Sequence, residues 1–241
     1  MNKKFLFKSI AVLGLTVTGA SGVFAASTGN TSQSKTTNVA TTLTPEQNTS
    51  NPTPPQPVGP NQNSNSNNTN NSLDSNFGIA YQPTAFDFQE SNLKSSGEQE
   101  ISINNKHSGA TYNVGVKDRT HDTKGWELKA QLLWKNHDLP GSSIMTEGNV
   151  LRKNVNVGSD FKAGDLQEIV PQSEASIVDN LNIISAPTLV MTGTAGMIHD
   201  TVYDDQLDGI KLKIMDTSKV SAGSYSGTVN WNLQLTPSDI S

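Results

Sequence analysis

The chain has 241 residues, a formal net charge of −5 and no cysteine. The absence of cysteine excludes disulfides, thiol catalysis, iron–sulfur clusters and cysteine-ligated zinc, so packing must stabilise the fold. The acidic balance argues against a nucleic-acid partner, because lysine and arginine are the side chains that bind phosphates.

Residues 1–25 have the pattern of a secretory signal peptide. Three lysines precede a short apolar run, and the stretch GVFAAS offers small residues for cleavage near Ala25 or Ala26. The run is too short for a good membrane span, and no later segment is apolar enough to cross a bilayer. Export would remove three of the 17 basic residues and none of the 22 acidic ones, so the net charge becomes 14 − 22, near −8.

Residues 26–76 are expected to form a disordered low-complexity linker. The stretch NPTPPQPVGP is followed by NQNSNSNNTNNS. No aromatic residue occurs from Ser27 to Asn76. Such a composition cannot bury enough apolar surface to offset its conformational entropy. The proline-rich part favours extended conformations, and the asparagine-rich part favours a flexible coil.

Residues 77–241 are expected to form one domain. All three tryptophans and all four tyrosines lie there. Apolar side chains alternate with polar ones in a series of short runs, which predicts strands with one buried face. These runs are EISIN (100–104), TYNVGVKD (111–118), GWELKAQLLW (125–134), GIKLKIMD (209–216) and GSYSGTVNWNLQL (223–235).

Several such strands without a long helical pattern predict an all-β fold, an antiparallel β-sandwich. The best helix candidate is the short stretch Ser173–Ser176. Four scattered histidines, at 107, 121, 137 and 199, form no metal-binding helix motif and are expected at the surface.

Two of the expected strands share the spacing Trp-x-Leu. One holds Trp126, Glu127 and Leu128, and the other holds Trp231, Asn232 and Leu233. Side chains two apart on a strand lie on the same face, so each Trp and Leu point together. The favoured interpretation is that both tryptophans anchor the core. A surface role in binding stays open.

Two charged groups invite other interpretations. Asp118 and Arg119 could close the turn before the first Trp-x-Leu strand as an ion pair, or the arginine could clamp a carboxylate ligand. The run HDTVYDDQLDG places four aspartates, at 200, 204, 205 and 208, before a glycine. These carboxylates could hold Ca²⁺, but the spacing does not match an EF-hand loop, and we expect a solvated loop and no metal.

The chain resembles the WxL-domain surface proteins of Gram-positive bacteria. The first motif region, VGVKDRTHDTKGWELKAQL (114–132), contains the Asp-Arg pair and then Gly-Trp-x-Leu. The second, GSYSGTVNWNLQLTP (223–237), is a Gly-x-Tyr-led strand that ends in Trp-x-Leu, and FGIAYQPTAFDF (77–88) resembles the family's opening. The resemblance extends over essentially all of residues 77–237.

This resemblance implies a secreted, non-enzymatic module that is retained on the cell wall by non-covalent binding of peptidoglycan. It implies no cofactor. It also implies other WxL proteins or companion surface proteins as further partners. On this basis the motif residues Trp126, Glu127, Leu128, Trp231, Asn232 and Leu233, with Asp118 and Arg119, are the candidate binding residues. The alternative is an adhesin or complex subunit that binds host matrix or companion proteins.

Overall fold

The computed structural model describes residues 37–47, 50–57, 66–105, 107, 109–135, 137–170 and 173–236. The chain divides into two units, and the second begins at Thr44. The described part of the first unit, residues 37–43, is exposed chain without helix or strand. The predicted signal peptide lies outside the described residues. None of the helices in the described ranges is long and apolar enough to span a membrane.

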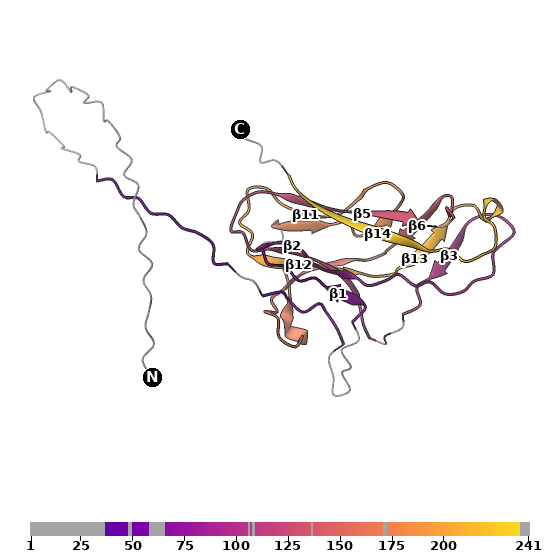
Figure 1. The fold of residues 1–241 in the computed structure, drawn as a ribbon, viewed down its shortest axis with the longest axis horizontal. Helices are drawn as coiled ribbons and strands as arrows, with labels where there is room; N and C mark the ends of the chain where they lie inside the picture. The colour runs from indigo at the N-terminus through magenta and orange to yellow at the C-terminus, as the bar shows by residue number, and fades with distance from the viewer. Residues whose placement is uncertain are drawn as a thin grey trace, which may run out of the picture. The chain divides into compact units, whose positions relative to one another are not determined.

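The described residues of the second unit form three antiparallel sheets, which confirms the all-β prediction (Figure 1). The first sheet has the order β1 (Asn68–Asn70), β2 (Phe77–Pro83), β4 (Tyr112–Asp118), β12 (Thr201–Leu207), β7 (Val150–Asn154) and β8 (Leu166–Gln167). The second has the order β10 (Asn182–Ile183), β6 (Ser142–Met145), β13 (Lys211–Ile214) and β3 (Gln99–Ser102). The third has the order β14 (Gly227–Leu235), β5 (Trp126–Trp134), β11 (Thr188–Gly193) and β9 (Ala175–Ile177). Two short 3₁₀ helices complete the list, η1 (Ala163–Asp165) and η2 (Thr217–Lys219).

The main core lies between the first sheet and the third. Figure 1 shows β5, β11 and β14 in one layer and β2 and β12 in the layer below. Alternation along β5 turns Trp126, Leu128, Ala130 and Leu132 inward. Side chains of β4 and β12 meet them from the opposite layer, as expected for a sandwich. Each of the five runs predicted as strands overlaps an observed strand.

The prediction of a helix at Ser173–Ser176 is wrong. Ala175–Ile177 form strand β9, which pairs antiparallel with β11. The Ser176 and Thr192 hydroxyls lie 2.7 Å apart across this pair. A stretch this short has too few internal hydrogen bonds to nucleate a helix, so the neighbouring strand decides its conformation.

Part of the segment before Phe77 is built into the second unit. Asn68–Asn70 form β1, which pairs with β2 at the edge of the first sheet. The side chains of Pro52, Pro54 and Pro55 are buried. These described residues differ from the disordered linker that the composition predicts, and the domain start at Phe77 stays a prediction.

Asparagine side chains hold this proline segment through its backbone. The Thr53 N–H donates to Asn156 Oδ1 at 3.0 Å, and Asn154 Nδ2 donates to the Thr53 carbonyl at 2.9 Å. Asn68 Nδ2 donates to the Pro55 carbonyl at 3.3 Å. Side-chain amides satisfy backbone groups of this segment that a neighbouring strand would otherwise satisfy. The segment is therefore held in place although it contains no apolar run.

We expect Asn156→Ala to accelerate hydrogen exchange of the Thr53 amide at least about fivefold, since a hydrogen bond of this kind is worth roughly 1 kcal/mol. Exchange measured by mass spectrometry on peptides that span residues 50–57 checks this. Asn180→Ala, a change at an exposed amide, is the control. Unchanged exchange at Thr53 would show that the segment is held by other contacts.

Candidate functional site

The two Trp-x-Leu motifs lie side by side in the third sheet. Strand β14 pairs antiparallel with β5 over nine residue pairs without a register shift. Leu233 lies opposite Leu128, and Trp231 lies opposite Ala130. Residues that are separated by about a hundred positions in the sequence thus form one continuous surface, and the structure brings both motifs to the same place.

Trp126 is an anchor of the core, as expected. Its side chain is fully buried, and its ring centroid lies 5.5 Å from that of Tyr203 and 6.4 Å from that of His199. A Cβ atom at Gly193, its cross-strand partner, would lie only 2.1 Å from the indole nitrogen, so glycine there makes room for the ring. The indole N–H has no hydrogen-bond partner among the described residues.

His199 is also buried, so the expectation that all four histidines lie at the surface is wrong for this one. One ring nitrogen lies 2.7 Å from the Tyr203 hydroxyl, and the other lies 3.1 Å from the Thr194 carbonyl. The Tyr203 hydroxyl donates in turn to Glu174, which pairs with Lys153 at 2.9 Å. These partners satisfy the buried polar groups, so a histidine can be buried in contact with Trp126.

Trp231 differs from the expected core anchor. It faces the core and packs against it, but it is only partly buried. The reason is its position, because β14 is the edge strand of the third sheet and no described strand lies beyond it. The ring therefore contacts the core on one side and is accessible on the other, and a role in binding stays a prediction.

The opposite face of β5 and β14 is polar and accessible. We call it the amide face and define it by the side chains of Asn230, Asn232 and Gln234 on β14 and of Glu127, Lys129 and Gln131 on β5. The three residues of β14 are exposed. None of their side-chain amides hydrogen-bonds to another described residue, so their donors and acceptors remain available to a ligand.

The β5 half of the amide face is more constrained. Glu127 and Lys129 form an ion pair at 2.7 Å, and Gln131 Nε2 donates to the Ser185 carbonyl at 2.7 Å. The pair neutralises the two charges, so the face as a whole carries amides and no net charge. Such a surface suits neutral, hydroxyl- and amide-rich ligands better than ionic ones.

Asp118 closes a turn, but not as an ion pair with Arg119. Its Oδ1 accepts hydrogen bonds from the Thr120 hydroxyl at 2.7 Å and the Thr120 N–H at 3.2 Å. The Arg119 N–H donates to the Asn76 carbonyl at 2.9 Å, and its side chain is buried. Burial also lowers the pKa of Arg119. A clamp on an external carboxylate would need an accessible guanidinium, so the geometry favours the structural role.

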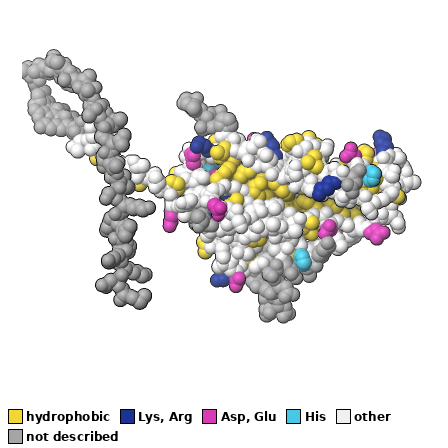
Figure 2. Space-filling view, viewed as in Figure 1, with side chains coloured by type: hydrophobic (Ala, Val, Ile, Leu, Met, Phe, Trp, Pro, Cys, Tyr) yellow, Lys and Arg dark blue, Asp and Glu magenta, His cyan; other side chains and the backbone are white. Residues whose placement is uncertain are grey.

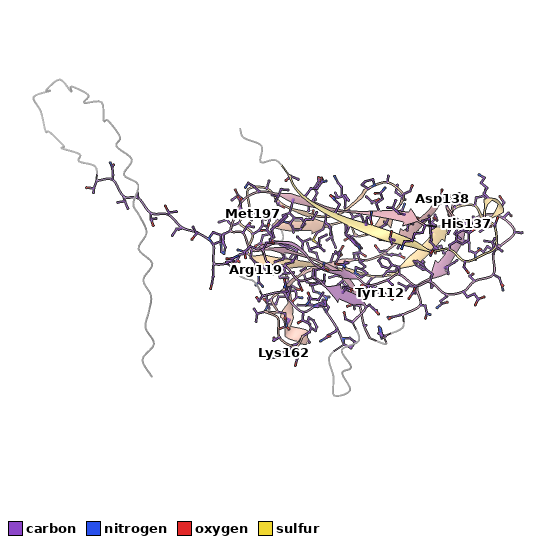
Figure 3. All side chains as sticks on the ribbon, viewed as in Figure 1. Tyr112, Arg119, His137, Asp138, Lys162 and Met197 are labelled. Atoms are coloured by element: carbon purple, nitrogen blue, oxygen red, sulfur yellow. The ribbon has the colours of Figure 1, made fainter. Side chains whose placement is uncertain are left out.

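A cleft at the far end of β5 was not anticipated from the sequence. It has a volume of about 720 Å³, and its lining includes Leu132, Trp134, Asp138, Met145, Asn182 and Met215. The Trp134 N–H donates to Ser142 Oγ at 3.0 Å, which fixes the indole against the second sheet. Figure 3 shows Asp138 and His137 at this end of the domain and Arg119 toward the other. The cleft forms between two sheets, so no single stretch of sequence signals it.

The solvated loop expected at residues 200–208 is wrong, because Thr201–Leu207 form the central strand β12 and Asp204 and Asp205 are buried. The four aspartates of this run do not come together as a group. Asp204 and Asp205 are neighbours on β12, so their side chains lie on opposite faces of the sheet. Among the described residues no group of three potential ligands is placed to hold a metal.

The two buried aspartates have very different surroundings. Asp204 accepts hydrogen bonds from the Tyr81 hydroxyl at 2.7 Å and from Asn113 Nδ2 at 2.9 Å. Both oxygens of Asp205 lack a partner among the described residues. Burial raises the pKa of Asp204 to about 7, and burial and the charge of Asp204 hold that of Asp205 well above its usual value.

The comparisons with known proteins point to one family. A family model described as "WxL domain surface cell wall-binding" matches residues 30–237. This range includes both paired motif strands and the proline segment that packs on the first sheet. No curated protein and no solved structure matches the chain.

Proposed function

The chain belongs to the family of WxL surface domains that bind the cell wall, and we propose that it holds peptidoglycan non-covalently through the amide face. It is a protein of the cell surface, associated with the wall. The binding is reversible and breaks no bond. Residues 1–25 would direct export and be removed.

One observation carries this proposal: the two motif strands pair in register, so their polar residues form a single accessible face. Glycan strands of peptidoglycan consist of N-acetylated amino sugars, which present hydroxyl and amide groups. The free amides of Asn230, Asn232 and Gln234 can both donate to and accept from such groups. Spaced along one strand, they match an extended polymer that lies along it.

The negative charge of the chain also favours peptidoglycan glycan over anionic wall polymers as the ligand. The formal net charge is −5, and loss of residues 1–25 would make it more negative. Anionic wall polymers would be repelled by such a protein. Affinity must therefore come from hydrogen bonds and apolar contacts, and the accessible part of Trp231 can supply the latter.

The test is co-sedimentation of the purified protein with deproteinised sacculi. We expect Asn230→Ser, Asn232→Ser and Gln234→Ser together to weaken binding roughly a hundredfold, at roughly 1 kcal/mol for each lost hydrogen bond. Gln167→Ser with Asn180→Ser, which change exposed amides outside the amide face, should bind as the unmodified chain does.

The rival function, an adhesin or complex subunit, makes a different prediction. Bare sacculi would then fail to retain the protein, and retention would require a host-matrix or companion protein. Equal binding by the triple variant and the control pair would instead place the wall contact elsewhere on the chain, with the Trp134 cleft as the next surface to test.

A further inference from the structure

The third sheet ends in an unusually long open strand. The three sheets have six edges, and five of them are strands of two to four residues: β1, β3, β8, β9 and β10. The sixth is β14, with nine residues. Proteins usually keep edge strands short, because a long edge presents unpaired backbone groups that recruit another strand.

The backbone of β14 shows which residues face this open edge. At one end Thr236 N–H donates to the Gly125 carbonyl at 2.8 Å, and at the other Lys135 N–H donates to the Ser226 carbonyl at 2.9 Å. Backbone groups alternate in direction along an antiparallel strand, so the even-numbered residues of β14 bond to β5. The odd-numbered residues, 227 to 235, turn their N–H and carbonyl groups outward. No hydrogen bond from a described residue reaches them.

The same odd-numbered residues form an apolar row that is only half covered. Val229, Trp231 and Leu233 pack against the core on one side, and Leu235 is 53% exposed. Figure 2 shows a band of hydrophobic side chains along the path of β14. A further strand beside β14 would cover this row and satisfy the outward backbone groups at once.

Protection against pairing is missing from β14. The sequence GTVNWNLQL contains no charged residue and no proline, and its register with β5 is uninterrupted, so the strand has no bulge. Charges, prolines and bulges are the usual means by which natural edges avoid other strands. By contrast, the edge strand β3 carries Glu100.

We infer that the open edge of β14 binds the same edge of a second copy of this chain, antiparallel, to form one continuous sheet across a twofold axis. Full overlap of the two strands places Trp231 opposite its counterpart, Val229 opposite Leu233 and Gly227 opposite Leu235. This register pairs odd-numbered residues with odd-numbered residues, which is what the outward hydrogen-bonding groups require.

The strand is complementary to itself in two further respects. Because it holds no charge, the register places no like charges opposite one another. The apolar row of one copy continues into that of the other, and aromatic and aliphatic cross-strand pairs stabilise such ladders. Each copy has one long edge among its described sheets, so pairing closes a dimer and does not continue into a fibre.

The dimer would place both amide faces on the same side of the joined sheet, since odd-numbered residues lie together on the other side. Two adjacent contact surfaces on one particle would bind a repeating polymer with the gain of multivalency. The pairing itself depends only on β14, so it can be tested without wall material and separately from the proposed function.

The first test is sedimentation equilibrium of the purified protein over a wide concentration range. We expect a reversible dimer. Val229→Lys places a charge in the apolar row and should leave a monomer, whereas the same change at Val170, which is 77% exposed and lies outside β14, should leave the dimer intact. A wild-type protein that stays monomeric at every concentration overturns the proposal, as does a folded Val229→Lys variant that dimerises normally.

A second test measures which residues of the two β14 strands lie opposite each other. It does not require the pairing to be disrupted. The chain has no cysteine, so Trp231→Cys introduces one thiol per copy. Directly opposite residues in a hydrogen-bonded pair have Cα atoms about 5.5 Å apart, which a disulfide can span. Mild oxidation should therefore cross-link Trp231→Cys rapidly, and Val170→Cys slowly or not at all. Equal cross-linking of the two variants would contradict pairing through β14.

Discussion

Replacing Trp126 by alanine is expected to lower the free energy of unfolding by about 3–5 kcal/mol, the range for removal of a large buried aromatic side chain. The indole is fully buried against Tyr203 and His199. Its loss opens a cavity that the rigid strands on either side cannot close. Urea denaturation followed by circular dichroism measures the change as a lower midpoint with an unchanged slope.

Trp231→Ala is the matched comparison, because both tryptophans occupy the same motif and the same sheet. In the single chain its side chain is partly buried at the edge strand, so at concentrations where the chain is monomeric we expect a cost of about 1–2 kcal/mol and a folded variant at room temperature. A loss as large as that of Trp126→Ala at those concentrations would mean that the edge of the third sheet is covered within the monomer and is not open for pairing.

The stability of the fold is expected to fall as the pH rises from about 4 to about 8. Burial raises the pKa of Asp204 to about 7, whereas an aspartate in an unfolded chain titrates near 3.9. The folded state therefore binds the proton more tightly. The stability that this group contributes is fully present below the unfolded pKa and is lost as the pH passes the folded pKa, by roughly 4 kcal/mol in total. The raised pKa of Asp205 acts in the same direction.

Asp205→Asn should reduce this dependence and stabilise the protein at alkaline pH. Neither oxygen of Asp205 has a partner among the described residues, and burial first, then the negative charges of Asp204, Asp179 and Asp208, oppose its ionisation. An amide of the same shape removes the buried charge. Thermal unfolding at several pH values measures the effect.

Asp138→Asn is the control for this experiment, because it removes a carboxylate from an exposed site. We expect its unfolding midpoint to follow that of the unmodified chain at each pH. If Asp205→Asn were less stable than the unmodified chain at alkaline pH, the Asp205 carboxylate would have a cation or donor beside it in solution.

The Trp-x-Leu motifs show how far the sequence alone reaches. Alternation along residues 125–134 and 223–235 predicts strands and predicts that each Trp and Leu share a face, and both predictions are confirmed within β5 and β14. These properties are local, because the direction of a side chain on a strand depends only on its position along that strand.

The sequence could not show how deeply each tryptophan is buried. Trp126 lies on a strand with neighbours on both sides, whereas Trp231 lies on the edge. The pairing order of strands is set by contacts between distant parts of the chain, which no short pattern records. For the same reason, alternation predicts a polar side on each of the two strands but not that these sides join into one amide face.

Predictions from composition differ most from the structure where polar residues are held or buried by tertiary contacts. Residues 50–57 and 66–70 have the composition of a flexible linker, yet Asn154, Asn156 and Asn68 hold the proline segment by its backbone. Asp204 and His199 are likewise polar but buried, because tertiary partners satisfy them. The sequence by itself determined five of the strands, their inward and outward faces and the family. Only the tertiary structure decided which strand forms the open edge and which polar groups lie inside, because both depend on partners that are distant in the chain.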